Sequence, residues 1–191
     1  MIVTISGTPG SGKSTVAKLV AKKLGWKHYS MGDLQRQVAE ERGISIAKLG
    51  ELEQTDPSID REIDALQIRL GKEEEDIIID SRLGAFFIPH AKLRIFLDAD
   101  EEERARRILH AERGEESYRN IEEAKEKMQE REEDNAQRYR KFYGIDHRDR
   151  KLYTHFLDTT HAVPEQTAEK ILLLIHQAQR TKPRNAGKRE K

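Results

Sequence analysis

The fold is decided near the start of the chain by the stretch Gly7-Thr8-Pro9-Gly10-Ser11-Gly12-Lys13-Ser14. This stretch satisfies the pattern G-x-x-x-x-G-K-[ST], whose glycines let successive backbone N–H groups converge on phosphate oxygens. It follows a β-branched run, residues 2–6, and precedes a segment with apolar residues at helical spacing, residues 15–24. A strand, a glycine-rich loop and a helix in this order predict a loop that cradles the phosphates of a nucleoside triphosphate.

Two side chains of this P-loop carry chemistry. Lys13 supplies a positive charge to the β- and γ-phosphates, and the Ser14 hydroxyl is expected to ligate Mg²⁺. The N-terminus of the following helix adds a favourable dipole for the phosphates. We therefore expect ATP as co-substrate together with Mg²⁺. The residues expected to bind ATP are Gly7, Thr8, Pro9, Gly10, Ser11, Gly12, Lys13, Ser14 and Thr15.

Apolar runs and helical patterns alternate along the rest of the chain. Further strands are predicted at residues 26–29, 76–80, 93–97 and 156–158, and further helices at residues 33–42, 45–53, 57–70, 100–110, 120–142 and 164–179. Strands that alternate with helices at this spacing imply a parallel sheet with right-handed crossovers. The sequence thus predicts an α/β fold, a three-layer α/β/α P-loop NTPase with a five-stranded parallel sheet.

Length and composition restrict the remaining possibilities. A chain of 191 residues suits one domain. Lys plus Arg equal Asp plus Glu at 35 each, so no overall charge favours nucleic acid or a membrane surface. The absence of cysteine excludes disulfides and thiolate zinc sites, and no apolar run approaches the ~18 residues of a membrane span. We expect a cytoplasmic protein. Residues 181–191, basic and without large apolar side chains, are expected to form a disordered tail.

A second group of polar residues follows the predicted strand at residues 76–80. Asp80 and Arg82 should emerge at the carboxyl end of this strand, where open α/β sheets bind ligands. Asp80 suits the magnesium shell or an acceptor, and Arg82 suits an anionic group. The alternative is that Asp80 caps a turn and pairs with Arg82. Arg36, at the start of a predicted helix, suits an acceptor phosphate, with a surface arginine as the alternative.

A segment rich in arginine and glutamate follows residue 100. Arg131 and Arg138 are seven residues apart, hence two turns apart on one helix face, and both could reach one transferring phosphoryl group. The other arginines are mostly expected on a solvated face, because glutamates interleave with them at salt-bridge spacing. These other arginines are Arg104, Arg106, Arg107, Arg113, Arg119 and Arg140.

Over nearly all of residues 1–176 the chain resembles nucleoside monophosphate (NMP) kinases, most closely cytidylate kinases of the short archaeal type. The matching segments are residues 7–18, 32–36, 59–62, 80–84, 93–99, 131–138 and 143–146. The resemblance implies reversible transfer of the ATP γ-phosphoryl group to CMP or dCMP. It further implies that Arg36 and Arg82 hold the monophosphate, that Arg131 and Arg138 belong to a lid, and that Arg107 faces ATP.

The resemblance also implies how the chain is divided. We expect one kinase domain over residues 1–180, with an NMP-binding helical insert at about 31–72 and a lid at about 108–142. It is expected to act as a monomer, without nucleic acid. Two positions depart from the family pattern, because Asn135 replaces the usual acid four residues after the first lid arginine and Ser81 stands where glycine is usual.

Two other functions remain open from the sequence. A small-metabolite kinase of the shikimate or gluconate type would phosphorylate a hydroxyl, and Asp33 or Asp80 could serve as its base. An ATP-dependent switch protein could contact nucleic acid through the basic residues 182–191. Neutral net charge and the lack of an aromatic stacking platform argue against the switch protein.

Overall fold

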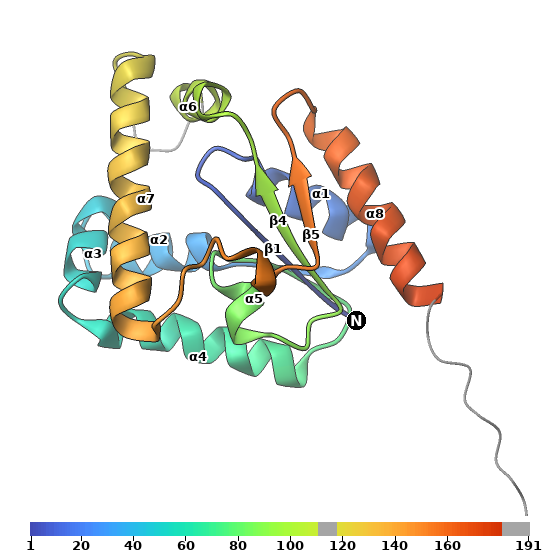
Figure 1. The fold of residues 1–191 in the computed structure, drawn as a ribbon. Coiled ribbons are helices and arrows are strands. Elements are labelled where there is room, and N and C mark those ends of the chain that lie inside the picture. The colour runs from blue at the N-terminus through green and yellow to red at the C-terminus, as the bar shows by residue number, and fades with distance from the viewer. Residues whose placement is uncertain (111–117, 181–191) are drawn as a thin grey trace, which may run out of the picture.

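Five parallel strands form the centre of the protein in the computed structural model, which describes residues 1–110 and 118–180. The order across the sheet is β2-β3-β1-β4-β5, so the first strand is central (Figure 1). This arrangement confirms the predicted five-stranded parallel sheet. The strands are β1 (Ile2–Gly7), β2 (Lys27–Ser30), β3 (Ile77–Asp80), β4 (Leu93–Asp98) and β5 (His155–Asp158).

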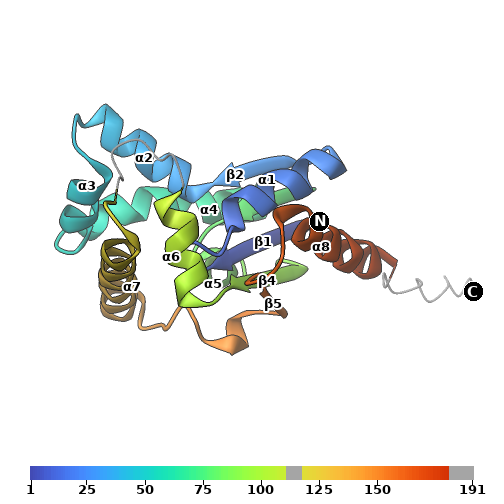
Figure 2. The same cartoon turned by 90° about the horizontal axis from the view of Figure 1, so that it is seen from above.

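Helices cover both faces of the sheet and make three layers (Figure 2). On one face, α1 (Lys13–Leu24) and α8 (Pro164–Arg180) pack against β1 and β4 through fully buried residues such as Val20 and Ile171. On the other face, α4 (Pro57–Glu73) covers β3, and α5 (Gly84–Phe87) packs against β1 and β4. The strands are apolar on both sides because both faces are covered, as the run of three isoleucines in β3 predicts.

Three helices lie between β2 and β3, over the residues where the sequence predicts an NMP-binding insert, and we call them the insert. They are α2 (Met31–Glu41), α3 (Ile46–Glu53) and α4, and each begins at a residue whose side chain accepts a hydrogen bond from a backbone N–H group of the first turn. Ala39, Leu49 and Ile59 pack together as a small core of their own. The insert therefore has its own packing and is joined to the sheet through apolar residues of α2 and α4.

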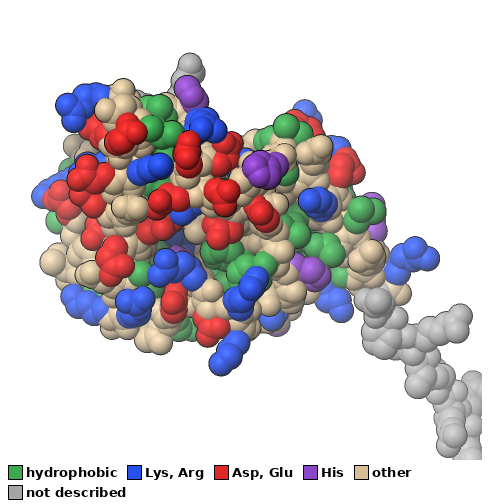
Figure 3. All heavy atoms as spheres, turned by 45° about the horizontal axis from the view of Figure 1, so that its top comes forward, with side chains coloured by type: hydrophobic (Ala, Val, Ile, Leu, Met, Phe, Trp, Pro, Cys, Tyr) green, Lys and Arg blue, Asp and Glu red, His purple; other side chains and the backbone are tan. Residues whose placement is uncertain are grey.

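Two strongly charged helices follow β4. They are α6 (Glu101–Leu109) and α7 (Ile121–Tyr143), and α7 begins at the Asn120 cap and ends at Gly144, whose φ of 68° is left-handed. Acidic and basic side chains alternate over this region (Figure 3), and pairs such as Arg106 with Glu102 at 3.0 Å join successive turns. This interleaving agrees with the predicted solvated helix face.

Two short elements were not predicted. They are α5 and the 3₁₀-helix η1 (Arg150–Leu152), each too short to show a period in the sequence. Residues 111–117 of the expected lid, among them Arg113, and the expected tail at 181–191 lie outside the described residues. In the ranges that the structure does describe, none of the helices is long and apolar enough to cross a membrane.

The packing of α8 predicts that two nearby residues of equal size contribute very differently to the free energy of unfolding. Ile175 is fully buried against the sheet, whereas Leu173 on the same helix is 60% exposed. Ile175→Ala should lower the free energy of unfolding by about 2–5 kcal/mol, because it leaves a cavity in the core. The control Leu173→Ala should change it by less than about 0.5 kcal/mol. Urea denaturation measures both, and equal effects would contradict this packing.

Candidate active site

The P-loop lies between the central strand β1 and the N-terminus of α1. Gly10 and Gly12 have φ angles of 80° and 83°, which side chains rarely adopt. A Cβ atom at Gly10 would also lie 2.5 Å from the backbone oxygen of Arg104. Glycine at residue 10 is therefore required twice, by the backbone angle and by the close approach of α6.

Three hydroxyl groups hold the P-loop in place. Thr8 Oγ1 donates to Asp98 Oδ1 at 2.7 Å, and Ser11 Oγ donates to the carbonyl of Thr8 at 2.8 Å. Thr159 Oγ1 donates to the carbonyl of Ser11 at 3.0 Å. The sequence analysis missed Asp98 and Thr159. Asp98 is an acid directly after the strand predicted at residues 93–97, and this position was a usable signal. Thr159 follows a weakly apolar strand, and the sequence does not show where that strand lies in the sheet.

Most arginines of this segment are expected on a solvated helix face, but Arg104 is buried. It is 8% exposed, its Nε donates to the carbonyl of Ala99 at 3.0 Å, and it pairs with Glu132 of α7. Its Nη1 also lies 3.5 Å from the carbonyl oxygen of Pro9. Arg104 is buried because α6 turns this face toward both the P-loop and α7, and the sequence gives no sign of that orientation.

Arg107 was expected to face ATP. Its Nη2 donates to the carbonyls of Thr159 and Thr160 at 2.7 and 3.2 Å, and its Nε pairs with Glu103. Through Thr159 it supports the loop that contacts Ser11 of the P-loop. Contact of Arg107 with ATP itself stays a prediction.

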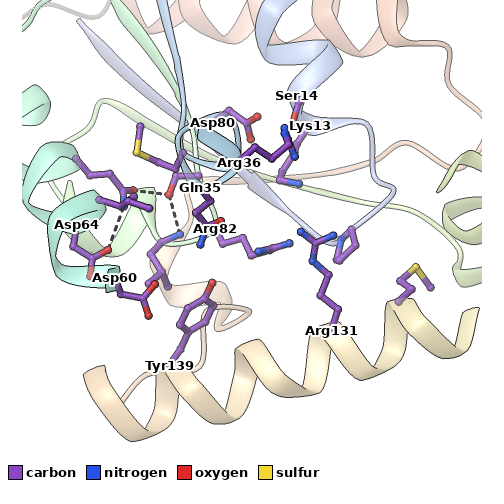
Figure 4. A pocket seen from close by; sticks show the side chains of 18 of the residues that line it. Lys13, Ser14, Gln35, Arg36, Asp60, Asp64, Asp80, Arg82, Arg131 and Tyr139 are labelled. Carbon is purple, nitrogen blue, oxygen red and sulfur yellow. Dashed lines mark hydrogen bonds between the residues drawn. The ribbon is translucent and has the colours of Figure 1, made fainter. Parts of the chain in front are cut away.

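One cavity brings together seven of the residues that the sequence analysis expects to bind ATP, Mg²⁺ or the acceptor (Figure 4). We call it the main cavity. It lies at the carboxyl ends of β1 and β3, as expected for an open α/β sheet. The seven residues are Pro9, Lys13, Ser14, Arg36, Asp80, Arg82 and Arg131.

The charges in the main cavity suit two anionic ligands and a cation. Arg36 is half-exposed and pairs with Asp33, so a phosphate can compete for it. Arg82 Nε is buried without a hydrogen-bond partner among the described residues. Asp80 is 3% exposed, and its Oδ1 likewise has no partner there. An unpaired carboxylate oxygen in the cavity that Ser14 also lines fits Mg²⁺ or its water shell.

Arg138 lies apart from this group. It is 3% exposed, pairs with Glu53 of α3, and its Nε lies 3.3 Å from Asp60 Oδ2. It lines a second cavity, between α3 and α7, which lacks Lys13 but which Arg82 and Arg131 also line. Although Arg131 and Arg138 share one side of α7, the carboxylates of the insert hold the Arg138 side chain away from the P-loop. Its role in phosphoryl transfer stays a prediction.

Asn135, one of the two expected departures from the family pattern, lies between these arginines on α7. Its Nδ2 donates to the carbonyl of Arg131 at 2.6 Å, and its Oδ1 accepts from Arg138 Nη2 at 3.2 Å. An amide can serve as donor and acceptor at once, which a carboxylate cannot. Asn135 thus helps to orient Arg138 without adding a further negative charge beside Glu53 and Asp60.

Three buried acids, Glu53, Asp60 and Asp64, form what we call the carboxylate cluster. Burial raises the pKa of Asp60 to about 7, although the nearby Arg138 guanidinium opposes the rise. Burial likewise raises the pKa of Asp64 to about 6, against the hydrogen bond donated by Tyr143 Oη. One guanidinium cannot neutralise three carboxylates, so the cluster retains a proton near neutral pH.

A family model for the cytidylate kinase-like family matches residues 2–161. The chain belongs to this family. A cytidylate kinase of Natronomonas pharaonis is 40% identical over 166 residues, which cover 86% of this chain and 84% of that protein. A cytidylate kinase of Halobacterium salinarum is 38% identical over 94% of this chain and 93% of its own length.

Solved structures show the same fold at low identity. An uncharacterized protein from Eubacterium ventriosum matches with a TM-score of 0.69 at 17% identity, covering 92% of this chain and 98% of its own. A shikimate kinase from Bacteroides thetaiotaomicron matches with a TM-score of 0.64 at 14% identity and the same coverage. These likenesses confirm the three-layer P-loop fold and carry no information on the acceptor.

The main cavity is also lined by residues that the sequence does not single out as a site. On α4 these are Asp60, Asp64 and Gln67, which lie on one side of the helix at spacings of four and three. That spacing was available in the sequence as a signal. Tyr139 of α7 also lines the cavity, but nothing in the sequence indicates which side of α7 faces α4.

The raised pKa of Asp60 predicts how stability depends on pH. Because the folded state binds this proton more tightly than the unfolded state, the stabilisation is complete below pH ~4 and is lost as pH rises toward 7. Between pH 5 and 8, Asp60 should therefore lower the free energy of unfolding by about 2 kcal/mol. In Asp60→Asn, the free energy of unfolding should no longer show this decrease between pH 5 and 8.

Urea denaturation at pH 5 and pH 8 measures the effect as a difference between variant and wild type. Asp134→Asn, on the exposed side of α7, is the matched control. A decline of the same size in Asp60→Asn and in wild type would show that Asp60 does not hold the proton.

Proposed function

We propose that this protein transfers the γ-phosphoryl group of ATP to CMP or dCMP, yielding ADP and CDP or dCDP. The observation that carries the proposal is the main cavity, which joins Lys13 and Ser14 of the P-loop to the cations Arg36, Arg82 and Arg131. A site for ATP alone has no need for arginines at the end of β3 and on α2. Membership of the cytidylate kinase-like family supports CMP as the acceptor.

The mechanism relies on positioning and charge. Lys13 and Arg131 are placed to neutralise the charge on the transferring phosphoryl group, while Arg36 and Arg82 hold the acceptor phosphate. Ser14 and Asp80 would hold Mg²⁺, which when bound would further neutralise the ATP phosphates. A monophosphate oxygen is already anionic, so the reaction needs no general base. This distinguishes it from phosphorylation of a hydroxyl.

The long helix α7 is placed to cover the site. Arg131 extends from α7 toward the P-loop side of the main cavity (Figure 4), and Tyr139 of α7 faces the same cavity. Closure of this helix over bound nucleotides would exclude water that otherwise hydrolyses ATP. We place Arg138 in the same lid, as a residue that holds the insert to α7. We further propose that the protein acts as a cytoplasmic monomer that does not require nucleic acid.

Lys13→Ala tests the catalytic part of the proposal. Loss of the charge at the β- and γ-phosphates should lower kcat by at least about a hundredfold. Lys22→Ala, on the exposed side of the same helix, should retain the wild-type rate. Coupled measurement of ADP formation with ATP and CMP gives both values. A nearly normal kcat for Lys13→Ala would overturn the mechanism.

The acceptor is tested by offering CMP, dCMP, UMP, AMP and GMP separately, with shikimate and gluconate as hydroxyl acceptors. We expect the highest kcat/KM with CMP or dCMP and no product from the alcohols. Phosphorylation of an alcohol without phosphorylation of any monophosphate would replace this proposal with a metabolite kinase. A variant that ends at Arg180 should keep the wild-type rate if residues 181–191 play no part in turnover.

A further inference from the structure

A chain of buried hydrogen bonds crosses the main cavity at the end formed by α4. Ser81 Oγ accepts from the backbone N–H of Leu83 at 3.2 Å and donates to Gln67 Oε1. Gln67 Nε2 donates to Asp64 Oδ1 at 3.4 Å, and Tyr143 Oη donates to Asp64 Oδ2. Asp64 and the dashed lines beside it appear in Figure 4. The chain links the end of β3, helix α4 and the end of α7.

The direction of these bonds is fixed at the Asp64 end, because an ionised carboxylate can only accept. The Ser81 hydroxyl accepts from the Leu83 N–H group with one lone pair and turns its own hydrogen to Gln67. Asp64 receives two donors, as suits a carboxylate. The Gln67 amide therefore has one orientation, with its oxygen toward Ser81 and its nitrogen toward Asp64.

Reversing that amide would be unfavourable. The Gln67 oxygen would then face the oxygen of Asp64, and the Ser81 hydroxyl would lose its acceptor. Gln67 is 2% exposed, so water is poorly placed to repair either loss. Asp64 and Ser81 thus act together as a lock on the Gln67 amide, and the Ser81 part of this lock depends on its hydroxyl.

Gln67 keeps hydrogen-bonding capacity beyond this chain. An amide has two N–H groups and two oxygen lone pairs, and among the described residues only one of each is used. Gln67 lines the main cavity, whose cations Lys13, Arg36 and Arg82 account for the phosphates. The same cavity is also lined by the apolar side chains of Met31, Ile63 and Leu83. A nucleotide held by its phosphate at the cations would therefore have these side chains and Gln67 available to its base.

We infer that Gln67, held in one orientation by Asp64 and Ser81, selects cytosine over uracil as the base of the acceptor. This inference rests on the proposed function, since it concerns the acceptor of that reaction. The two bases differ along one edge, where cytosine offers an amino donor beside a ring-nitrogen acceptor, and uracil offers an oxygen acceptor beside an N–H donor. A locked amide matches the first pattern, with its oxygen to the amino group and its N–H to the ring nitrogen.

A free amide would not discriminate, because rotation by 180° exchanges its donor and acceptor and matches uracil equally well. The lock converts an indifferent side chain into a selective one. Gln67 is then the residue that contacts the base, and Ser81 is a positioning residue. Asp64 and Tyr143 support the same orientation from the other side.

The test compares kcat/KM for CMP and UMP in Ser81→Ala and Gln67→Met. Ser81→Ala keeps the Cβ atom and removes one of the two groups that hold the amide, so the CMP-to-UMP ratio should fall about twofold to tenfold, partly through faster use of UMP. Gln67→Met keeps the length of the side chain and removes both polar groups. It should raise KM for CMP more than it lowers kcat and bring the ratio near one.

Ser58→Ala on α4 and Gln37→Met on α2, both exposed, are the matched controls and should keep the wild-type ratio. Loss of stability alone would lower the rates with both acceptors and leave their ratio unchanged. If Ser81→Ala does not fold, the Gln67→Met ratio decides. A wild-type ratio in either folded variant would overturn the inference.

Calorimetric titration of CMP and of UMP into the protein without ATP separates this inference from the proposed function. Preferential binding of CMP that is lost in Gln67→Met supports base selection even if no phosphoryl transfer occurs. Phosphorylation of CMP with an unchanged ratio in both variants would retain the function and reject the role of Gln67.

Discussion

The structure depends on the close contact between Gly10 of the P-loop and the backbone of Arg104. This contact requires a left-handed residue without a side chain, and it fixes α6 directly beside the loop. Arg104 then extends past Pro9 to pair with Glu132, which brings α7 to the same place. One steric constraint in the phosphate loop therefore also positions the helix that supplies Arg131.

A second connection joins α7 to the helical insert. Arg138 pairs with Glu53 and lies beside Asp60, all three almost fully buried. A buried ion pair contributes little net stability, because both charges lose their hydration on folding. Removing one partner by mutation is nevertheless strongly destabilising, because the other charge is left buried and unpaired. We infer that this pairing fixes the geometry of the insert relative to α7 more than it stabilises the fold. The acceptor side and the lid side of the main cavity are thereby held at a defined separation.

The sequence predicts those features that depend on local patterns. The P-loop and the five strands follow from a motif and from apolar runs, and Arg36, Asp80 and Arg82 follow from their place at strand ends, so the structure brings them together in one cavity. Arg138 illustrates the limit. Helical spacing places it on the same side of α7 as Arg131, but its direction depends on carboxylates about eighty residues away in the sequence. Such partners are set by tertiary packing, which no local pattern records.

The separation of charge in the main cavity explains how one pocket can hold an anion beside buried acids. Lys13, Arg36 and Arg82 lie toward the P-loop, while Asp60 and Asp64 lie toward α4 (Figure 4). In a partly buried cavity, charges of one sign repel more strongly than in water, so a phosphate is disfavoured near α4 and favoured near the P-loop. The acids therefore define the orientation of a bound nucleotide as well as the arginines do. With the phosphate restricted to one end, the hydrogen-bonding groups at the other end are free to distinguish the base.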